Sequence, residues 1–425
     1  MAVVSALPSS TVACCSNADT EGANPLSEET VRASLDQLGT NADGCLVYAR
    51  CNLCGLQLTS IRLLSSYVHL QRLSLDGNQL VSLQPLQTLR SLVYLSAANN
   101  AINDAVFSDL ASSSATLERL NLDGNSLTSL NGLCKLPFLM DFSASRNNIT
   151  ELSAADFAVH SSLTRLNLAM NNISCVHLDT FAKCHTIRTL NLSCNKIEDA
   201  SFVVHLAGNL EVLNLRDNKV DKLTDFDVLR NLVFLYLSGN MIQDWGELDN
   251  VSDLTNLRIL TLYDNPLLRA PAYPHENSDF PREDTACVAE DVDFVSSRVC
   301  NLISASTLRP VMGTTNLVSV VPPAARSVVQ HIPVASQERE VWDNDSALEL
   351  GRLPYWERCR LRIISIMPHI QVLDDVQVDP REIPRAMRLY KNTVYSAPET
   401  VVDDMGSQCS SVKIIEWRRI RGYRK

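Results

Sequence analysis

The stretch Leu166–Ile173, LNLAMNNI, decides the fold, because its frame L-x-L-x-x-N-x-L returns along most of the chain. The other clear copies start at Leu73, Leu95, Leu120, Phe142, Leu190, Leu213, Leu235 and Leu260. A degenerate first copy, LVYARCNL, is expected to start at Leu46, with Cys51 at the asparagine position. Successive copies start 22 to 27 residues apart, so we predict ten repeated units.

The residue types in the frame have a physical meaning. The two frame leucines lie two positions apart on a short strand, so their side chains point to the same, buried face. The asparagine follows where the chain turns away from the strand, and a buried amide must find hydrogen-bond partners. We expect it to bond main-chain groups that the turn leaves free, so that stacked units form an asparagine ladder. A single unit cannot bury its own apolar face, and stability must come from stacking.

This period and frame resemble the leucine-rich repeat over roughly Leu46–Leu267. The resemblance implies an α/β solenoid, a horseshoe of about ten repeats whose concave face is a parallel β-sheet. The stretch NMIQDWGELDNV, Asn240–Val251, is similar to the intracellular class that includes the protein phosphatase 1 regulatory subunit of this fold, the spliceosomal A-prime protein and several ciliary proteins. The longer middle units are expected to place Phe157 and Phe181 on the convex side.

Both ends of the array need a cover, because a terminal repeat would expose its core. Before the repeats, SEETVRASLDQLG has Ser27 as N-cap and Gly39 as a stop signal, which predicts a capping helix. After the repeats, RIISIMPHIQVLDD, Arg362–Asp375, resembles the C-terminal cap of the same intracellular class. The residues expected to cover the last repeat are Ile363, Ile364, Met367, Ile370 and Leu373.

The last repeat and this C-terminal cap are far apart in the sequence. Between Arg269 and Leu353 the frame is lost, prolines are frequent and acids cluster from Glu276 to Asp293, which predicts a long flexible loop. Such an insertion is tolerable because the entropy of closing a loop grows slowly with its length. The expected layout is a disordered N-terminus (1–24), a capping helix (25–45), the repeats (46–268), a flexible insert (269–353), the C-terminal cap (354–390) and a tail with a basic end (391–425).

The composition narrows the class of protein. The formal net charge of -11 argues against a dedicated nucleic-acid binder, so RNA is not an expected partner. Thirteen scattered cysteines, an odd number, favour reduced thiols over a disulfide framework. The N-terminal residues lack the pattern of a secretory signal, and no uninterrupted run of about 18 apolar residues occurs, so no membrane span is expected. We predict a cytoplasmic protein, with the nucleus and the cilium as alternatives.

The concave surface can be predicted from the frame. Residues one before, one after and three after the first frame leucine should point into the concavity. Early and middle units give a polar lining of mixed charge, whereas the last three give aromatic and aliphatic side chains beside an arginine, as binding hot spots do. The predicted partner-binding residues are Val212, Arg216, Phe234, Tyr236, Ile259 and Tyr263. The competing interpretation is that the insert or the tail folds back over them. Trp245 is expected in the core.

No nucleophile, phosphate loop or metal constellation stands out in the sequence. Cys51 and Cys54 form a C-x-x-C pair without a second pair at zinc spacing, so we predict neither a metal site, nor a cofactor, nor an enzyme. In the tail, Lys413, Ile415 and Trp417 of KIIEW resemble the docking motif of protein phosphatase 1 partners. The competing interpretation is an amphipathic basic segment lying on an acidic surface.

These observations lead to three functional hypotheses. The first is a non-catalytic scaffold that binds a protein partner on the concave face of the last repeats. The second is a phosphatase-targeting subunit whose partner is a phosphatase catalytic subunit. The third is a component of a ribonucleoprotein or of a ciliary or axonemal assembly. A shared fold does not identify the partner.

Overall fold

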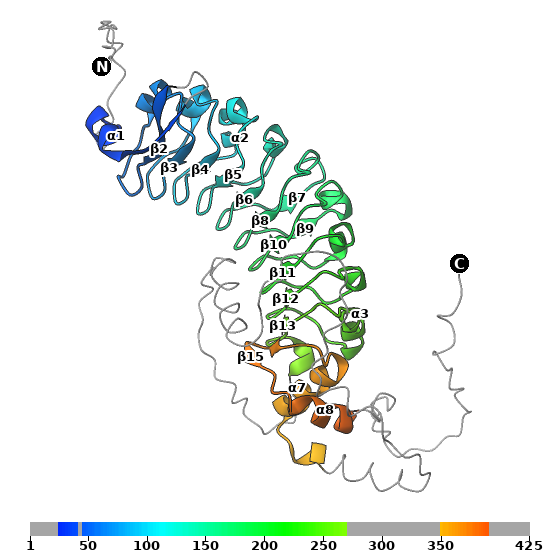
Figure 1. Cartoon of the computed structure of the whole chain (residues 1–425). Helices are drawn as coiled ribbons and strands as arrows, with labels where there is room; N and C mark the ends of the chain where they lie inside the picture. The colour runs from blue at the N-terminus through cyan, green and yellow to red at the C-terminus, as the bar shows by residue number, and fades with distance from the viewer. Residues whose placement is uncertain (1–23, 41–44, 270–348, 391–425) are drawn as a thin grey trace, which may run out of the picture.

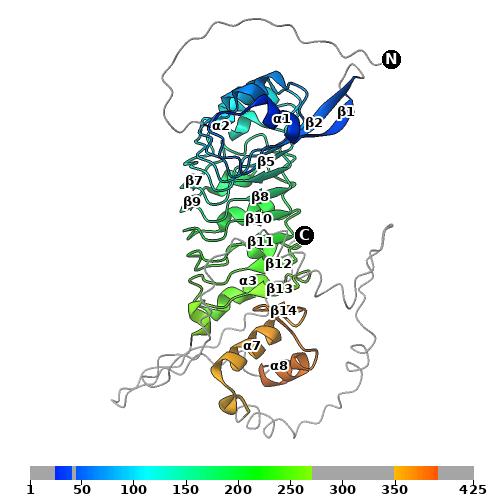
Figure 2. The same ribbon diagram turned by 90° about the vertical axis from the view of Figure 1, so that its left-hand side faces the viewer.

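The computed structural model describes residues 24–40, 45–269 and 349–390, which form one curved array of stacked coils (Figure 1). Residues 270–348 of the predicted insert and the whole predicted tail, including the motif of Lys413, Ile415 and Trp417, lie outside the described residues, as does nearly all of the predicted disordered N-terminus. The end of the predicted insert is described, and its Leu350 and Leu353 pack against the core. The predicted leucine-rich-repeat solenoid is confirmed. Its sheet lines the concave side, and short helical turns cover the convex side (Figures 1 and 2).

The concave side is a single 13-stranded sheet. Its strands, in spatial order, are β1 Leu35–Thr40, β2 Leu46–Asn52, β3 Arg72–Ser74, β4 Tyr94–Ser96, β5 Arg119–Asn121, β6 Asp141–Ser143, β8 Arg165–Asn167, β10 Thr189–Asn191, β11 Val212–Asn214, β12 Phe234–Tyr236, β13 Ile259–Thr261, β14 Val372–Leu373 and β15 Val376–Gln377. All neighbours from β2 to β14 pair in parallel, and only the outermost pairs, β1 with β2 and β14 with β15, are antiparallel. A second, two-stranded sheet joins β7 Glu151–Leu152 to β9 Cys175–Val176.

The helices are short within the repeats and longer at the C-terminal end. The α-helices are α1 Glu28–Ser34, α2 Val106–Asp109, α3 Asp249–Ser252, α7 Tyr355–Ile366 and α8 Glu382–Tyr390. The 3₁₀ helices are η1 Arg62–Ser66, η2 Gln84–Thr88, η3 Ala111–Ser113, η4 Leu133–Lys135, η5 Leu178–Phe181, η6 Ser201–Leu206, η7 Phe226–Val228, η8 Trp245–Leu248 and η9 Pro266–Leu268. On the convex side the rings of Phe157, Phe181 and Phe202 contact one another with centroids 5.3 and 5.6 Å apart. The predicted convex positions of Phe157 and Phe181 are thus confirmed.

The predicted asparagine ladder is also present. The side chain of Asn147 donates hydrogen bonds to the carbonyls of Leu122, Ala144 and Ser145, and its Oδ1 accepts from the Leu127 N–H at 3.0 Å. Asparagines in equivalent positions bond in the same way along the array, from Asn78 to Asn265. Each asparagine therefore links its own unit to the preceding one.

The prediction for the first repeat was wrong by five residues. Cys51, not Leu46, pairs with Leu73, so Cys51 occupies the first leucine position and Leu56 the asparagine position. Cys51 is buried, whereas Leu46 is 73% exposed. Burial raises the pKa of the Cys51 thiol to about 12, which fits an uncharged core side chain.

The helix that caps the N-terminal end of the array is shorter than predicted. α1 does follow Ser27, whose hydroxyl accepts a hydrogen bond from the Thr30 N–H at 3.2 Å, but it ends at Ser34 and not at Gly39. The chain then continues as β1 and runs antiparallel to β2. A helix cannot pair the main-chain groups of the outermost repeat strand, and an added strand can. The helix contributes buried Val31 to the core.

The C-terminal segment packs directly on the tenth repeat despite the sequence gap. β14 pairs with β13, with Leu373 opposite Leu260, and α7 and α8 lie beyond it (Figure 1). The five predicted covering residues are all buried: Ile363, Ile364, Met367, Ile370 and Leu373. Trp245, expected in the core, is only partly buried and packs against it, and the guanidinium carbon of Arg362 lies 4.1 Å from its ring centroid.

Asp374 ends the series of parallel strands. In inner units the N–H of the second frame leucine donates to the next strand, as Leu237 N–H does to the Thr261 carbonyl at 2.9 Å. In the last unit Asp374 Oδ1 accepts from the N–H groups of Leu262 and Tyr263 at 2.6 and 3.0 Å. Burial raises the pKa of this carboxyl to about 6. A side chain thus replaces the main-chain acceptor that an eleventh full repeat would have supplied.

Candidate functional site

In each parallel strand of the concave sheet, from β2 to β14, the residue that precedes the first frame position occupies the same place. Strand pairing aligns these residues into one continuous line across the concave sheet, here called the edge row. The edge row consists of Arg50, Arg72, Tyr94, Arg119, Asp141, Arg165, Thr189, Val212, Phe234, Ile259 and Val372. Its first part is mainly charged and its last part is apolar, so the concave face has a polar half and an apolar half.

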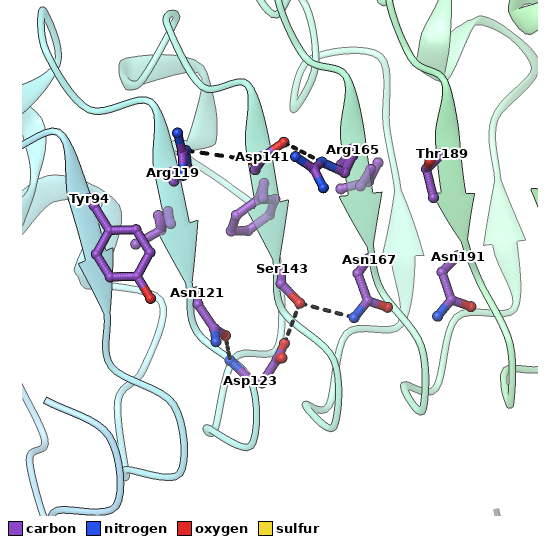
Figure 3. A pocket seen from close by; sticks show the side chains of 13 residues that line it. Tyr94, Arg119, Asn121, Asp123, Asp141, Ser143, Arg165, Asn167, Thr189 and Asn191 are labelled. Carbon is purple, nitrogen blue, oxygen red and sulfur yellow. Dashed lines mark hydrogen bonds and ion pairs between the residues drawn. The ribbon is translucent and has the colours of Figure 1, made fainter. Parts of the chain in front are cut away.

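The polar half contains a shallow hollow of about 240 Å³ over β4 to β10. Figure 3 shows Arg119 and Arg165 on either side of Asp141, with Tyr94 on the neighbouring strand. Asp141 accepts a hydrogen bond from Arg165 Nε at 2.9 Å, while Arg119 Nε stays 3.8 Å from the same carboxylate. The two arginine side chains are more than half exposed, whereas the Asp141 side chain is 26% exposed. Two guanidinium groups therefore flank a single carboxylate on an open surface.

The floor of the hollow is held by hydrogen bonds between side chains of adjacent units. Asp123 Oδ1 accepts from the Ser143 hydroxyl and from the Ser145 N–H, both at 2.6 Å. Asn167 Nδ2 donates to Ser143 Oγ at 3.0 Å (Figure 3). Asp76 makes the equivalent bonds two units earlier. Asp76 and Asp123 hold the turns through these hydrogen bonds. The arginines around the hollow belong to the edge row.

The apolar half differs from the sequence-based expectation. Three of the six predicted contact residues are buried, because side chains on adjacent strands fill the space between one another: Val212, Tyr236 and Ile259. Phe234 packs against this cluster and remains partly exposed. Tyr236 is therefore not an exposed contact residue, and the buried members form an apolar floor against which Phe234 packs.

Arg216 and Tyr263 lie beside this floor and contact each other. The guanidinium carbon of Arg216 is 5.2 Å from the Tyr263 ring centroid, and its Nε donates to Ser238 Oγ at 2.9 Å. Both side chains are partly exposed. A guanidinium that is already stacked and hydrogen-bonded loses little further conformational freedom on binding. This favours contact with a partner.

The structure adds residues that sequence reasoning did not select. Val372 joins the apolar cluster from the C-terminal segment, and only the pairing of β14 with β13 reveals this across the gap. Tyr94 and Thr189 line the polar hollow. Both lie one residue before a frame leucine, so the same rule that identified the other residues could have found them.

Among the described residues, no three His, Cys, Asp or Glu side chains are grouped to hold a metal ion. Cys51 lies in the core and Cys54 on the surface, so the C-x-x-C pair does not share one site. Within the same residues, no helix is long and apolar enough to cross a membrane.

The comparisons with known proteins agree with this fold. The leucine rich repeat family profile matches residues 137–197, and the chain is a leucine-rich-repeat protein. More particularly, it belongs to the family of leucine-rich repeat-containing protein 23. Its 275-residue match to the cattle (Bos taurus) and human proteins is 30% identical and covers 59% of this chain, and 72% and 71% of those proteins. Their names state no partner or activity.

One similar solved structure is the functional domain of InlJ from Listeria monocytogenes. It superimposes with a TM-score of 0.45 at 24% identity, covering 53% of this chain and 46% of that one. Proteins built from leucine-rich repeats are generally non-enzymatic modules for protein–protein interaction. The finer resemblance to the phosphatase regulator and to the spliceosomal protein stays a hypothesis.

Proposed function

We propose that the protein is a non-catalytic scaffold that binds a protein partner on its concave face, with the apolar half of the edge row at the centre of the contact. The observation that carries the proposal is the arrangement at β11 to β13. Phe234 is partly exposed and packs against a buried apolar floor, and the Arg216–Tyr263 stack comes from the two flanking units. Aromatic and arginine side chains around a dry centre dominate the energetics of protein interfaces.

The cellular setting follows from the cysteines. Three of the cysteines within the described residues are buried free thiols: Cys51, Cys184 and Cys359. Reduced thiols support a location in the cytoplasm, with the nucleus and the cilium as alternatives. The phosphatase hypothesis depends on Lys413, Ile415 and Trp417, which lie outside the described residues. No contact among the described residues specifically supports the ribonucleoprotein or the ciliary hypothesis. We therefore propose the general scaffold.

The double variant Phe234→Ala/Tyr263→Ala tests the proposed function. It removes the two accessible aromatic rings and leaves the buried floor in place, so we expect capture of the specific partners in quantitative proximity labelling to fall at least tenfold. Leu178→Ala is the matched control, because Leu178 is 50% exposed in η5 on the convex side. Circular dichroism and thermal melting check that both variants are folded. The same set of captured proteins from the wild type and the double variant would disprove the proposed interface.

A further inference from the structure

Three of the four arginines of the edge row are evenly spaced, and the fourth, Arg50, lies on β2 directly beside Arg72. Arg72, Arg119 and Arg165 lie on β3, β5 and β8, and each is separated from the next by one intervening strand. The intervening positions are Tyr94 and Asp141. Adjacent strands are about 4.8 Å apart, so neighbouring arginines repeat at about 10 Å along the row. The surface thus offers three cations in a line with a fixed period.

Arg72 is the least compensated of these positive charges. Arg119 and Arg165 have Asp141 between them, at 3.8 and 2.9 Å. In the part of the chain that the structure describes, Arg72 has no ion-pair partner. A guanidinium presents several N–H donors in one plane and matches a carboxylate with two parallel hydrogen bonds. The edge row is therefore complementary to carboxylates on a partner, and the exposed rims of the hollow leave room for them.

The period of the arginines favours one kind of partner backbone. Residues i and i+7 of an α-helix lie on the same face and about 10.5 Å apart. Same-face residues of an extended strand are about 6.6 or 13 Å apart, which does not match a spacing of about 10 Å. A helix thus brings a carboxylate to each arginine in turn, whereas a strand does not.

We propose that the partner docks as an α-helix along the edge row, with carboxylates at i, i+7 and i+14 facing Arg72, Arg119 and Arg165. This inference rests on the proposed function, because the same helix continues onto the apolar half. The distance from Arg72 to Phe234 spans seven strand spacings, or about 34 Å, which a helix of about 22 residues covers. Its acidic end occupies the polar hollow and its apolar end contacts Phe234.

A pair of synthetic helices tests the proposal. The in-phase peptide is an alanine-based helix with Glu at positions 4, 11 and 18 and Leu at positions 25 and 29, which by helix rise would face the three arginines, Val212 and Phe234 in turn. The permuted peptide has the same composition, with its three glutamates moved to different faces. Fluorescence anisotropy with the full chain measures both affinities. We expect the in-phase peptide to bind at least tenfold tighter and to lose about tenfold between low and moderate salt.

The charge-reversed chain Arg72→Glu/Arg119→Glu provides the decisive comparison. We expect it to lose the preference for the in-phase peptide and to bind tightly a peptide with Lys at positions 4 and 11, which also shows that the variant is folded. Equal binding of the in-phase and permuted peptides to the wild type would overturn the proposal, as would a preference that survives in the variant.

Phe234→Ala separates a failure of this inference from a failure of the proposed function. If Phe234→Ala weakens both peptides equally and phase has no effect, the apolar contact stands and the acidic helix is wrong. If phase matters and Phe234→Ala changes nothing, the basic row binds the helix and the apolar half is not the centre of the contact.

Discussion

A chain that ends at Leu353 is expected to lose the tenth repeat as a stable unit. The cut removes α7, α8, β14 and the residues that join them, whose buried side chains include Leu361, Ile364, Met367 and Leu373. Fully burying each such side chain contributes about 1.5–3 kcal/mol, so the free energy of unfolding should fall by roughly 5–10 kcal/mol. The cut also removes Asp374, which accepts hydrogen bonds from Leu262 and Tyr263.

Hydrogen exchange localises this effect, because terminal repeats of a solenoid unfold before inner ones. The matched control is a chain that ends at Tyr390 and so keeps every described residue. We expect main-chain amides of β13 to lose protection in the shorter chain only, while those of β5 and β6 stay protected in both. If β13 is equally protected in the two chains, the C-terminal segment is not the cover of the last repeat.

Asn147→Ala is expected to be strongly destabilising, whereas Asn148→Ala is expected to be nearly neutral. The two asparagines are adjacent, but Asn147 is 6% exposed and makes four hydrogen bonds to the main chain, while Asn148 is exposed. The alanine leaves the Leu127 N–H and three carbonyls without this partner. Since each buried polar group left unpaired costs about 1–3 kcal/mol, we expect a loss of about 3–5 kcal/mol. Urea unfolding of both variants measures it. A similar loss from each would mean that the ladder does not hold adjacent units together.

Most of the fold could be predicted from the sequence because many copies of one frame support the same assignment. Nine clear copies of one frame fix the strand positions, and the buried asparagines and convex phenylalanines follow from burial and hydrogen bonding alone. The first unit was misplaced because LVYARCNL imitates the frame, with Leu46 in the apparent first position. Only packing against Leu73 shows that Cys51 holds that position. Local pattern is least reliable at the array's ends, where one neighbour is missing.

The candidate site was predicted less completely. The position of a residue in the frame identified the concave residues, but it takes no account of side chains on the adjacent strands. Whether a side chain is exposed depends on the adjacent strand, and so Tyr236 and Ile259 turned out to be buried while Phe234 stayed partly accessible. The contribution of Val372 depends on a pairing across a long stretch of sequence, which no local pattern encodes. The even spacing of Arg72, Arg119 and Arg165 becomes visible only when the strands are placed side by side.

The central claim is that partners bind the concave face, and site-specific photo-crosslinking in cells tests it most directly. The photoreactive residue p-benzoylphenylalanine replaces either Tyr94, in the polar hollow of the concave face, or Leu178, exposed on the convex side. We expect a discrete crosslinked partner band from position 94, which the in-phase helix removes by competition, and no band from position 178. A partner band from position 178, with none from position 94, would contradict it.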